Sequence, residues 1–251
     1  MSPKFAPPSA TAIALVTVTT NDLKATLANL PNPSADWLRA TGFTASIGAL
    51  AASPNADGSI KAVYVGLGAK GQTRVRFGIA AAAAELPTGT YVLDTILTGP
   101  ALEEAALGLL LSLYQFDRYK AAPAQDRAFV APAGIDAVRI EALAAGECLT
   151  RDLINTPASD MGPDELAGAA QKLAIQHGAT LTIIQGDDLL AQNFPLIHAV
   201  GRASPRTPRL IDMSWGHSGP KLTLVGKGVC FDTGVLNLNP GASMGLMKKD
   251  M

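Results

Sequence analysis

Histidine, cysteine and long apolar runs are scarce in this sequence. The three histidines, His177, His198 and His217, are too scattered for a zinc-binding spacing, and no H-E-x-x-H pattern occurs. The two cysteines, Cys148 and Cys230, lie far apart without a secretory start, which favours a reducing compartment over a disulfide framework. No apolar run approaches the roughly 18 residues that a membrane-spanning helix needs. We therefore expect a cytoplasmic protein with no membrane partner.

Charge is also scarce, and it is evenly balanced. Charged residues make up 16% of the sequence and the net charge is −1, so no basic surface supports nucleic-acid binding. With 48% hydrophobic residues, the chain is too apolar to be intrinsically disordered. Its 251 residues suffice for one large domain or two ordinary ones. The composition predicts a globular protein with no nucleic-acid partner.

Strand-like and helix-like segments alternate in the first half of the chain. We expect strands at 12–18, 45–50, 61–65 and 91–97, a loop at 31–33, and helices at 36–39, 77–86 and 101–120. This alternation predicts a small α/β domain over residues 1–125. The Pro/Ala-rich segment 121–134 is expected to be a linker.

The second half shows clear helix boundaries. A helix over 135–153 should stop before Pro157, because the residue before a proline is steered away from helical geometry. The next helix should begin at Pro163, which the first turn tolerates, and end at Gly178, a typical C-cap. Strands are expected to follow at 181–184, 210–215 and 222–225.

A glycine pattern follows the predicted strand at 61–65. Residues 66–71, GLGAKG, fit the G-x-G-x-x-G pattern of dinucleotide-binding proteins. The acidic residue expected about 20 positions later is missing, because Glu85 comes too early and Asp94 too late. The following QTRVRF reads as extended chain instead of a helix start. We prefer a tight turn here, and a nucleotide-binding module stays an alternative.

Residues 221–251, KLTLVGKGVCFDTGVLNLNPGASMGLMKKDM, carry the most specific chemistry. A strand-like run ends in a lysine between two glycines, Lys227, and Asp232 follows closely. Asp250 comes 18 residues after Asp232. Glycines let the backbone approach a ligand closely, and carboxylates are oxygen ligands for divalent metals. The segment therefore predicts a metal site.

Other candidate side chains are interpreted as structural. Cys230 is expected to be a buried apolar residue, and Asp187 and Asp188 are expected to be solvated loop acids. Ser159 and Ser214 lack the glycines of a nucleophile elbow, which argues against a serine hydrolase.

The C-terminal segment resembles the metal-site signature of the leucyl aminopeptidases, the cytosol aminopeptidase family of dinuclear metallopeptidases. Three ordered features match: the G-K-G-x-x-F-D-[ST]-G spacing, the following Asn-Pro-x-x-x-Met, and the closing Lys-Asp-Met. RDLINTPASDMGPDELA and AVGRASPRTPRLIDMSWG also resemble the family, so the likeness covers about residues 135–251. The resemblance implies that Lys227, Asp232 and Asp250 are metal ligands.

The resemblance implies a fold and an activity as well. It implies a small N-terminal α/β domain (1–125), a linker and connecting helix (126–155), and the first part of a larger α/β zinc-peptidase-like catalytic domain (156–251). Such an enzyme releases N-terminal, leucine-type residues from peptides, using two divalent ions, zinc or manganese, to activate a water. A homo-hexamer is also implied.

Two residues depart from the family pattern. Val235 replaces a glycine, and Asn239 replaces the lysine thought to polarise the scissile carbonyl. An asparagine can donate a hydrogen bond but carries no charge to stabilise an oxyanion. The family's remaining ligands lie in a segment that would follow Met251. We therefore expect little peptidase activity from these 251 residues alone, and a catalytically dead family member with a structural or regulatory role stays an alternative.

Overall fold

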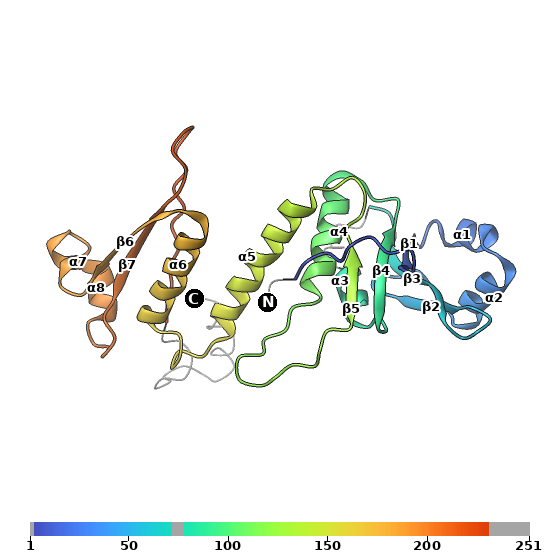
Figure 1. Cartoon of the computed structure of the whole chain (residues 1–251), viewed down its shortest axis with the longest axis horizontal. Helices are drawn as coiled ribbons and strands as arrows, with labels where there is room; N and C mark the ends of the chain where they lie inside the picture. Colours follow the sequence, from blue (N-terminus) through green and yellow to red (C-terminus); the bar gives the residue numbers. More distant parts are fainter. Residues whose placement is uncertain (1–2, 72–77, 231–251) are drawn as a thin grey trace. The chain divides into compact units, whose positions relative to one another are not determined.

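The computed structural model describes residues 3–71 and 78–230, and the chain divides into two compact units, Met1–Leu149 and Thr150–Met251. The first unit is built on a five-stranded sheet and the second on a two-stranded sheet (Figure 1). Across the described ranges, none of the helices is both long and apolar enough to cross a lipid bilayer.

The sheet of the first unit has the strand order β2-β3-β1-β4-β5. Its strands are β1 (Ile13–Thr19), β2 (Leu50–Pro54), β3 (Ile60–Gly68), β4 (Gly89–Asp94) and β5 (Arg127–Val130). Strands β3 and β4 run parallel to β1, β5 runs parallel to β4, and β2 runs antiparallel to β3. The helices of this unit are α1 (Leu23–Asn29), α2 (Asn32–Ala40), α3 (Gly78–Ala84), α4 (Gly99–Leu111) and α5 (Ala137–Asn155), of which α5 continues into the second unit.

Helices cover both faces of this sheet. Successive side chains of a strand point to opposite faces, so Val63 and Val65 enter one core with α3 and α4, whereas Ala62 and Tyr64 enter another with α2. Parallel strands buried on both faces read as continuous apolar runs. The strands expected at 61–65 and 12–18 are confirmed as β3 and β1. Burial on both faces explains their continuous apolar sequences.

A third apolar cluster joins α4 to the first part of α5. It contains Ala106 and Leu110 of α4, and Ile140 and Ala144 of α5. Cys148 is also buried in this cluster and takes part in no disulfide. The helix predicted over 135–153 is confirmed as α5.

The strand predicted at 45–50 is wrong. Ala45 is fully buried with a positive φ of 56°, and it lies in a loop. This loop bonds to β3: the Gly68 amide donates to the Ala45 carbonyl at 2.9 Å, and the Gly66 amide donates to the Ala49 carbonyl at 2.8 Å. Strand β2 therefore begins only at Leu50.

The linker predicted at 121–134 contains strand β5. Arg127–Val130 pairs in parallel with β4, and Phe129 is fully buried in the first core. The Arg127 guanidinium donates to the Ala83 carbonyl at 2.9 Å and to the Ala84 carbonyl at the end of α3. A four-residue strand is too short to show a periodic apolar pattern, so the sequence did not predict it. Pairing with β4 and the burial of Phe129 stabilise it instead.

The helix predicted at 101–120 is too long. Helix α4 ends at Leu111, where the Ser112 hydroxyl donates to the Leu109 carbonyl at 2.6 Å. A serine that bonds its own backbone in this way competes with helical hydrogen bonding. The loop predicted at 31–33 is also wrong, because α2 starts at Asn32 and its first turn includes a proline.

The second unit holds α6 (Pro163–His177), β6 (Thr180–Gln185), α7 (Asp188–Ala191), α8 (Pro195–Gly201) and β7 (Arg209–Ser214). Strands β6 and β7 pair antiparallel, with Ile183 opposite Ile211. The predicted bounds of α6 are confirmed, including the C-cap at Gly178, whose φ is +64°.

The strand predicted at 222–225 is wrong. These residues form neither helix nor strand, and Leu222, Leu224 and Val225 are 81%, 86% and 93% exposed. A strand needs a neighbour to satisfy its backbone groups, and β6 and β7 pair only with each other among the described residues. The apolar pattern alone therefore did not make this segment a strand.

Candidate functional site

Only one of the predicted site residues lies within the described part of the chain. Lys227 is exposed and belongs to a segment without helix or strand. Asp232, Asn239 and Asp250, together with Val235, lie outside the described residues.

The second glycine beside Lys227 has a packing role. A Cβ atom at Gly228 would lie 3.0 Å from Cδ2 of Leu166, in α6. Such a separation is tighter than ordinary van der Waals contact. The lysine-bearing segment therefore lies against the first turns of α6.

The first turn of α6 is stabilised by a carboxylate. The Gly162 amide, at the N-cap, donates to Oε2 of Glu165 at 2.9 Å. This bond satisfies one of the amides that a helix start leaves without an intrahelical partner. Hydrogen bonds from the backbone amides of Glu165 itself and of Gly162 lower the pKa of Glu165, and the charge of Arg206 adds to this effect.

Two arginines of the AVGRASPRTPRLI segment bind the same helix start. Arg206 donates through Nη1 to Oε2 of Glu165 at 3.0 Å and through Nη2 to the Ser159 carbonyl at 2.6 Å. Arg209 pairs with Asp164. The guanidinium of Arg206 approaches closely because Gly162 has no side chain, since a Cβ there would lie 2.0 Å from Nη1.

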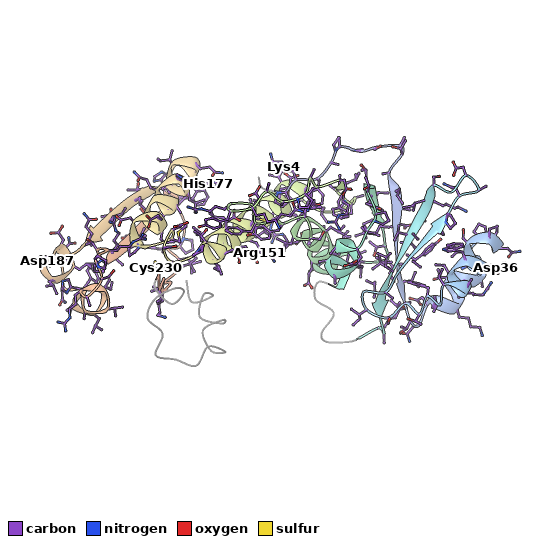
Figure 2. The ribbon with its side chains drawn as sticks, turned by 90° about the horizontal axis from the view of Figure 1, so that it is seen from below. Lys4, Asp36, Arg151, His177, Asp187 and Cys230 are labelled. Carbon is purple, nitrogen blue, oxygen red and sulfur yellow. The ribbon has the colours of Figure 1, made fainter. Side chains whose placement is uncertain are left out.

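Cys230, at the end of the described chain (Figure 2), lies within range of the charges of Arg206 and Glu165. Burial raises the pKa of its thiol; the charge of Glu165 raises it further and that of Arg206 lowers it. A raised pKa keeps the thiol neutral and weakly nucleophilic. The prediction of a buried residue is confirmed only in part, because Cys230 is partly exposed.

We expect acid to weaken the start of α6 through Glu165. A carboxyl whose folded pKa lies below its ordinary value of 4.5 stabilises the fold above that pH, and this stabilisation is lost as pH falls through the lowered pKa. Asp160 opposes the shift by raising the pKa. Glu165→Gln keeps an oxygen that can accept from the Gly162 amide but carries no titrating carboxyl, so it should reduce the loss of stability below about pH 4.5.

Urea unfolding of the wild type and Glu165→Gln at a series of pH values measures this effect. Glu147→Gln serves as the control, because Glu147 lies in α5, outside the α6 cap. Identical pH dependence in the wild type and Glu165→Gln would contradict the prediction.

The acids near α7 are remote from this region. Asp187 precedes α7, its side chain is 97% exposed, and its Oδ1 lies 3.3 Å from Nε2 of His198. Figure 2 shows Asp187 and Cys230 at separate places in the second unit. The interpretation of Asp187 as a solvated acid is confirmed.

A metal site needs more donors than the described residues bring together. Within the ranges 3–71 and 78–230, no group of three or more histidine, cysteine, aspartate or glutamate side chains is arranged to hold an ion. The described segment contributes an exposed amine at Lys227. One amine with two carboxylates suits zinc or manganese in donor chemistry, so the predicted ligand set fits a divalent ion.

Gly66, the first glycine of the 66–71 pattern, is explained by packing. Strand β3 continues to Gly68, and only then does the chain turn. A Cβ at Gly66 would lie 2.0 Å from the Ser46 carbonyl oxygen. The amides of Gly66 and Gly68 are already bonded to the loop before β2, so they do not face a phosphate. Residues 72–77, which follow the pattern, lie outside the described residues.

Both units combine helices with a β-sheet and so have a mixed α/β architecture. Residues 13–132 match the profile of the M17 aminopeptidase N-terminal domain, and residues 148–251 match that of the cytosol aminopeptidase family, catalytic domain. The chain belongs to the cytosol aminopeptidase family. The N-terminal match was not visible from the sequence motifs, which showed only a generic α/β pattern there.

Similar proteins support this assignment over most of the chain. A probable cytosol aminopeptidase of Brucella melitensis is 34% identical over 238 residues, covering 84% of this chain and 49% of the relative. The crystal structure of the cytosol aminopeptidase of Coxiella burnetii matches 98% of this chain and 53% of its own, with a TM-score of 0.85 and 33% identity. The chain spans about half the length of the relatives it matches.

A third similar protein was solved with a metal. The bottromycin maturation enzyme BotP in complex with Mn is 29% identical, with a TM-score of 0.71, over 93% of this chain and 51% of that enzyme. A family neighbour thus uses a divalent metal ion.

Proposed function

We propose that this chain is part of a metal-dependent aminopeptidase that releases leucine-type N-terminal residues from peptides. One observation carries the proposal: the ordered G-K-G-x-x-F-D spacing lies within the segment that matches the family's catalytic domain. The exposed amine of Lys227, on a segment lying against α6, agrees with a ligand role.

Three residues of this chain would hold the ions. We propose Lys227, Asp232 and Asp250 as ligands of two divalent ions, zinc or manganese, and the manganese complex of BotP favours manganese. When bound, such ions supply Lewis-acid activation of water and of the peptide carbonyl. A lysine binds a metal only as the neutral amine.

The oligomeric state and the cellular location are proposed from the family resemblance alone. A cytoplasmic location agrees with the name of the cytosol aminopeptidases that the chain resembles, whereas homo-hexamer assembly rests on the sequence resemblance alone. The domain boundaries at 1–125, 126–155 and 156–251 stay predictions.

A catalytically dead family member is the second candidate. Val235 and Asn239 favour it, because both replace residues of the family pattern. A β-branched residue is strained where a glycine has a positive φ, and an asparagine supplies no charge for an oxyanion. On either candidate, we expect these 251 residues to hydrolyse leucine amides slowly or not at all.

We expect Asp232→Ala to weaken Mn²⁺ binding by at least about 100-fold, because even residues outside the ligand set cost 10–100-fold in metal affinity. Isothermal titration calorimetry of the chain with Mn²⁺ measures the change.

Asp188→Ala is the matched control, because Asp188 is an acid of α7 outside the proposed ligand set. It should bind Mn²⁺ like the wild type. Equal binding by Asp232→Ala and the wild type would overturn the ligand assignment.

A further inference from the structure

We infer that Arg206 is a positioning residue: it holds the first turn of α6 in the conformation against which the lysine-bearing segment 226–230 lies. The inference rests on the proposed function, because segment 226–230 matters for chemistry only if Lys227 is a metal ligand. It assigns a role to a residue that has no metal-binding chemistry of its own.

Arg206 connects two parts of the chain that lie far from it in sequence. Its guanidinium bonds the Ser159 carbonyl at 2.6 Å, before α6, and the Glu165 carboxylate at 3.0 Å, inside the first turn. A planar guanidinium presents several donors in a fixed fork, so one side chain fixes both acceptors relative to each other. The Arg206 guanidinium thereby bridges the two ends of the turn from Ser159 to Glu165.

The carboxylate in this pair is itself bonded to the backbone. Oε2 of Glu165 accepts from the Gly162 amide at 2.9 Å as well as from Arg206. Loss of the arginine would therefore release a carboxylate that also caps the helix. Gly162 leaves the space that the guanidinium occupies.

The lysine-bearing segment contacts the residue next to this pair. Gly228 lies against Leu166, which directly follows Glu165 in α6. Cys230 lies within reach of the charges of both Glu165 and Arg206. Lys227 thus lies one residue before a glycine seated on the turn that Arg206 fixes.

The arrangement is better suited to positioning than to global stability. The side chains of Arg206 and Glu165 are 36% and 41% exposed, and exposed ion pairs contribute little to the stability of a fold. The effect of removing Arg206 should therefore be local to the helix start and to the segment beside it.

Limited proteolysis by a lysine-specific endoprotease tests the inference, with Mn²⁺ titration of the same variants. In Arg206→Ala, cleavage after Lys227 should be about tenfold faster. The substitution removes a charge-assisted hydrogen bond, and its loss lowers the free energy of local opening. Mn²⁺ affinity should fall by roughly 10–100-fold, as for other residues that orient ligands. Arg206→Lys, which keeps the charge but not the fork, should give intermediate values.

Arg202→Ala is the matched control, because Arg202 is an exposed arginine at the end of α8. It should leave both readouts unchanged. Cleavage after Lys172, within α6, reports opening of the helix itself, and a rise there equal to that at Lys227 would overturn the inference.

The two readouts separate this inference from the proposed function. Unchanged cleavage at Lys227 in Arg206→Ala would overturn the positioning role whatever the metal does. Faster cleavage in a chain whose wild type binds no Mn²⁺ would support the positioning role and refute the metal site.

Discussion

Asn239→Lys is expected to raise the rate of leucine amide hydrolysis by this chain by about 10²–10³-fold in the presence of Mn²⁺. The reason is electrostatic: an ammonium stabilises the negative charge that develops on the carbonyl oxygen in the transition state, and one such stabiliser accounts for a factor of that order. Release of the amine product, measured as kcat/KM, gives the change.

Asn237→Lys is the matched control for this prediction. It places the same charge two residues earlier in the same segment, so a nonspecific effect of charge would appear in both variants. If Asn239→Lys leaves the rate unchanged while Mn²⁺ binds normally, the catalytically dead alternative is favoured.

Gly66→Ala is expected to destabilise the first unit by about 3 kcal/mol, the upper end of the cost of overpacking a core. The added methyl would lie 2.0 Å from the Ser46 carbonyl oxygen, which belongs to the backbone and has no rotamer to change. The hydrogen bond from the Gly66 amide to the Ala49 carbonyl would also be strained. Thermal unfolding measures the effect, with an expected fall in Tm of roughly 6–12 °C.

Gly146→Ala is the matched control, because Gly146 lies inside α5 and a Cβ there meets no atom within 4 Å. That variant should gain about 0.5–1 kcal/mol, since alanine favours a helix over glycine. A Gly66→Ala protein as stable as the wild type would refute the packing explanation and favour the nucleotide-binding interpretation.

Elements with strong local signals were predictable from the sequence. The strands at 12–18 and 61–65 read as apolar runs because both of their faces are buried. Helix α6 was predictable because Pro163 and Gly178 mark its ends by backbone geometry that holds in any tertiary context.

Elements that depend on distant partners were not predictable. Strand β5, Arg127–Val130, exists through pairing with β4 and through its contact with the end of α3. The loop at Ala45 takes its conformation from bonds to β3. At 222–225 an apolar pattern has no neighbouring strand among the described residues and stays exposed.

The candidate site likewise has features with local sequence signals and features that depend on distant contacts. The sequence alone determined the ordered lysine and aspartate spacing and its resemblance to the cytosol aminopeptidase family, because the residue types and glycines of this pattern are local in the chain. The tertiary structure alone decided that Gly228 lies on α6 and that Arg206 fixes the start of that helix. Those contacts join residues more than 40 positions apart, which no local pattern encodes.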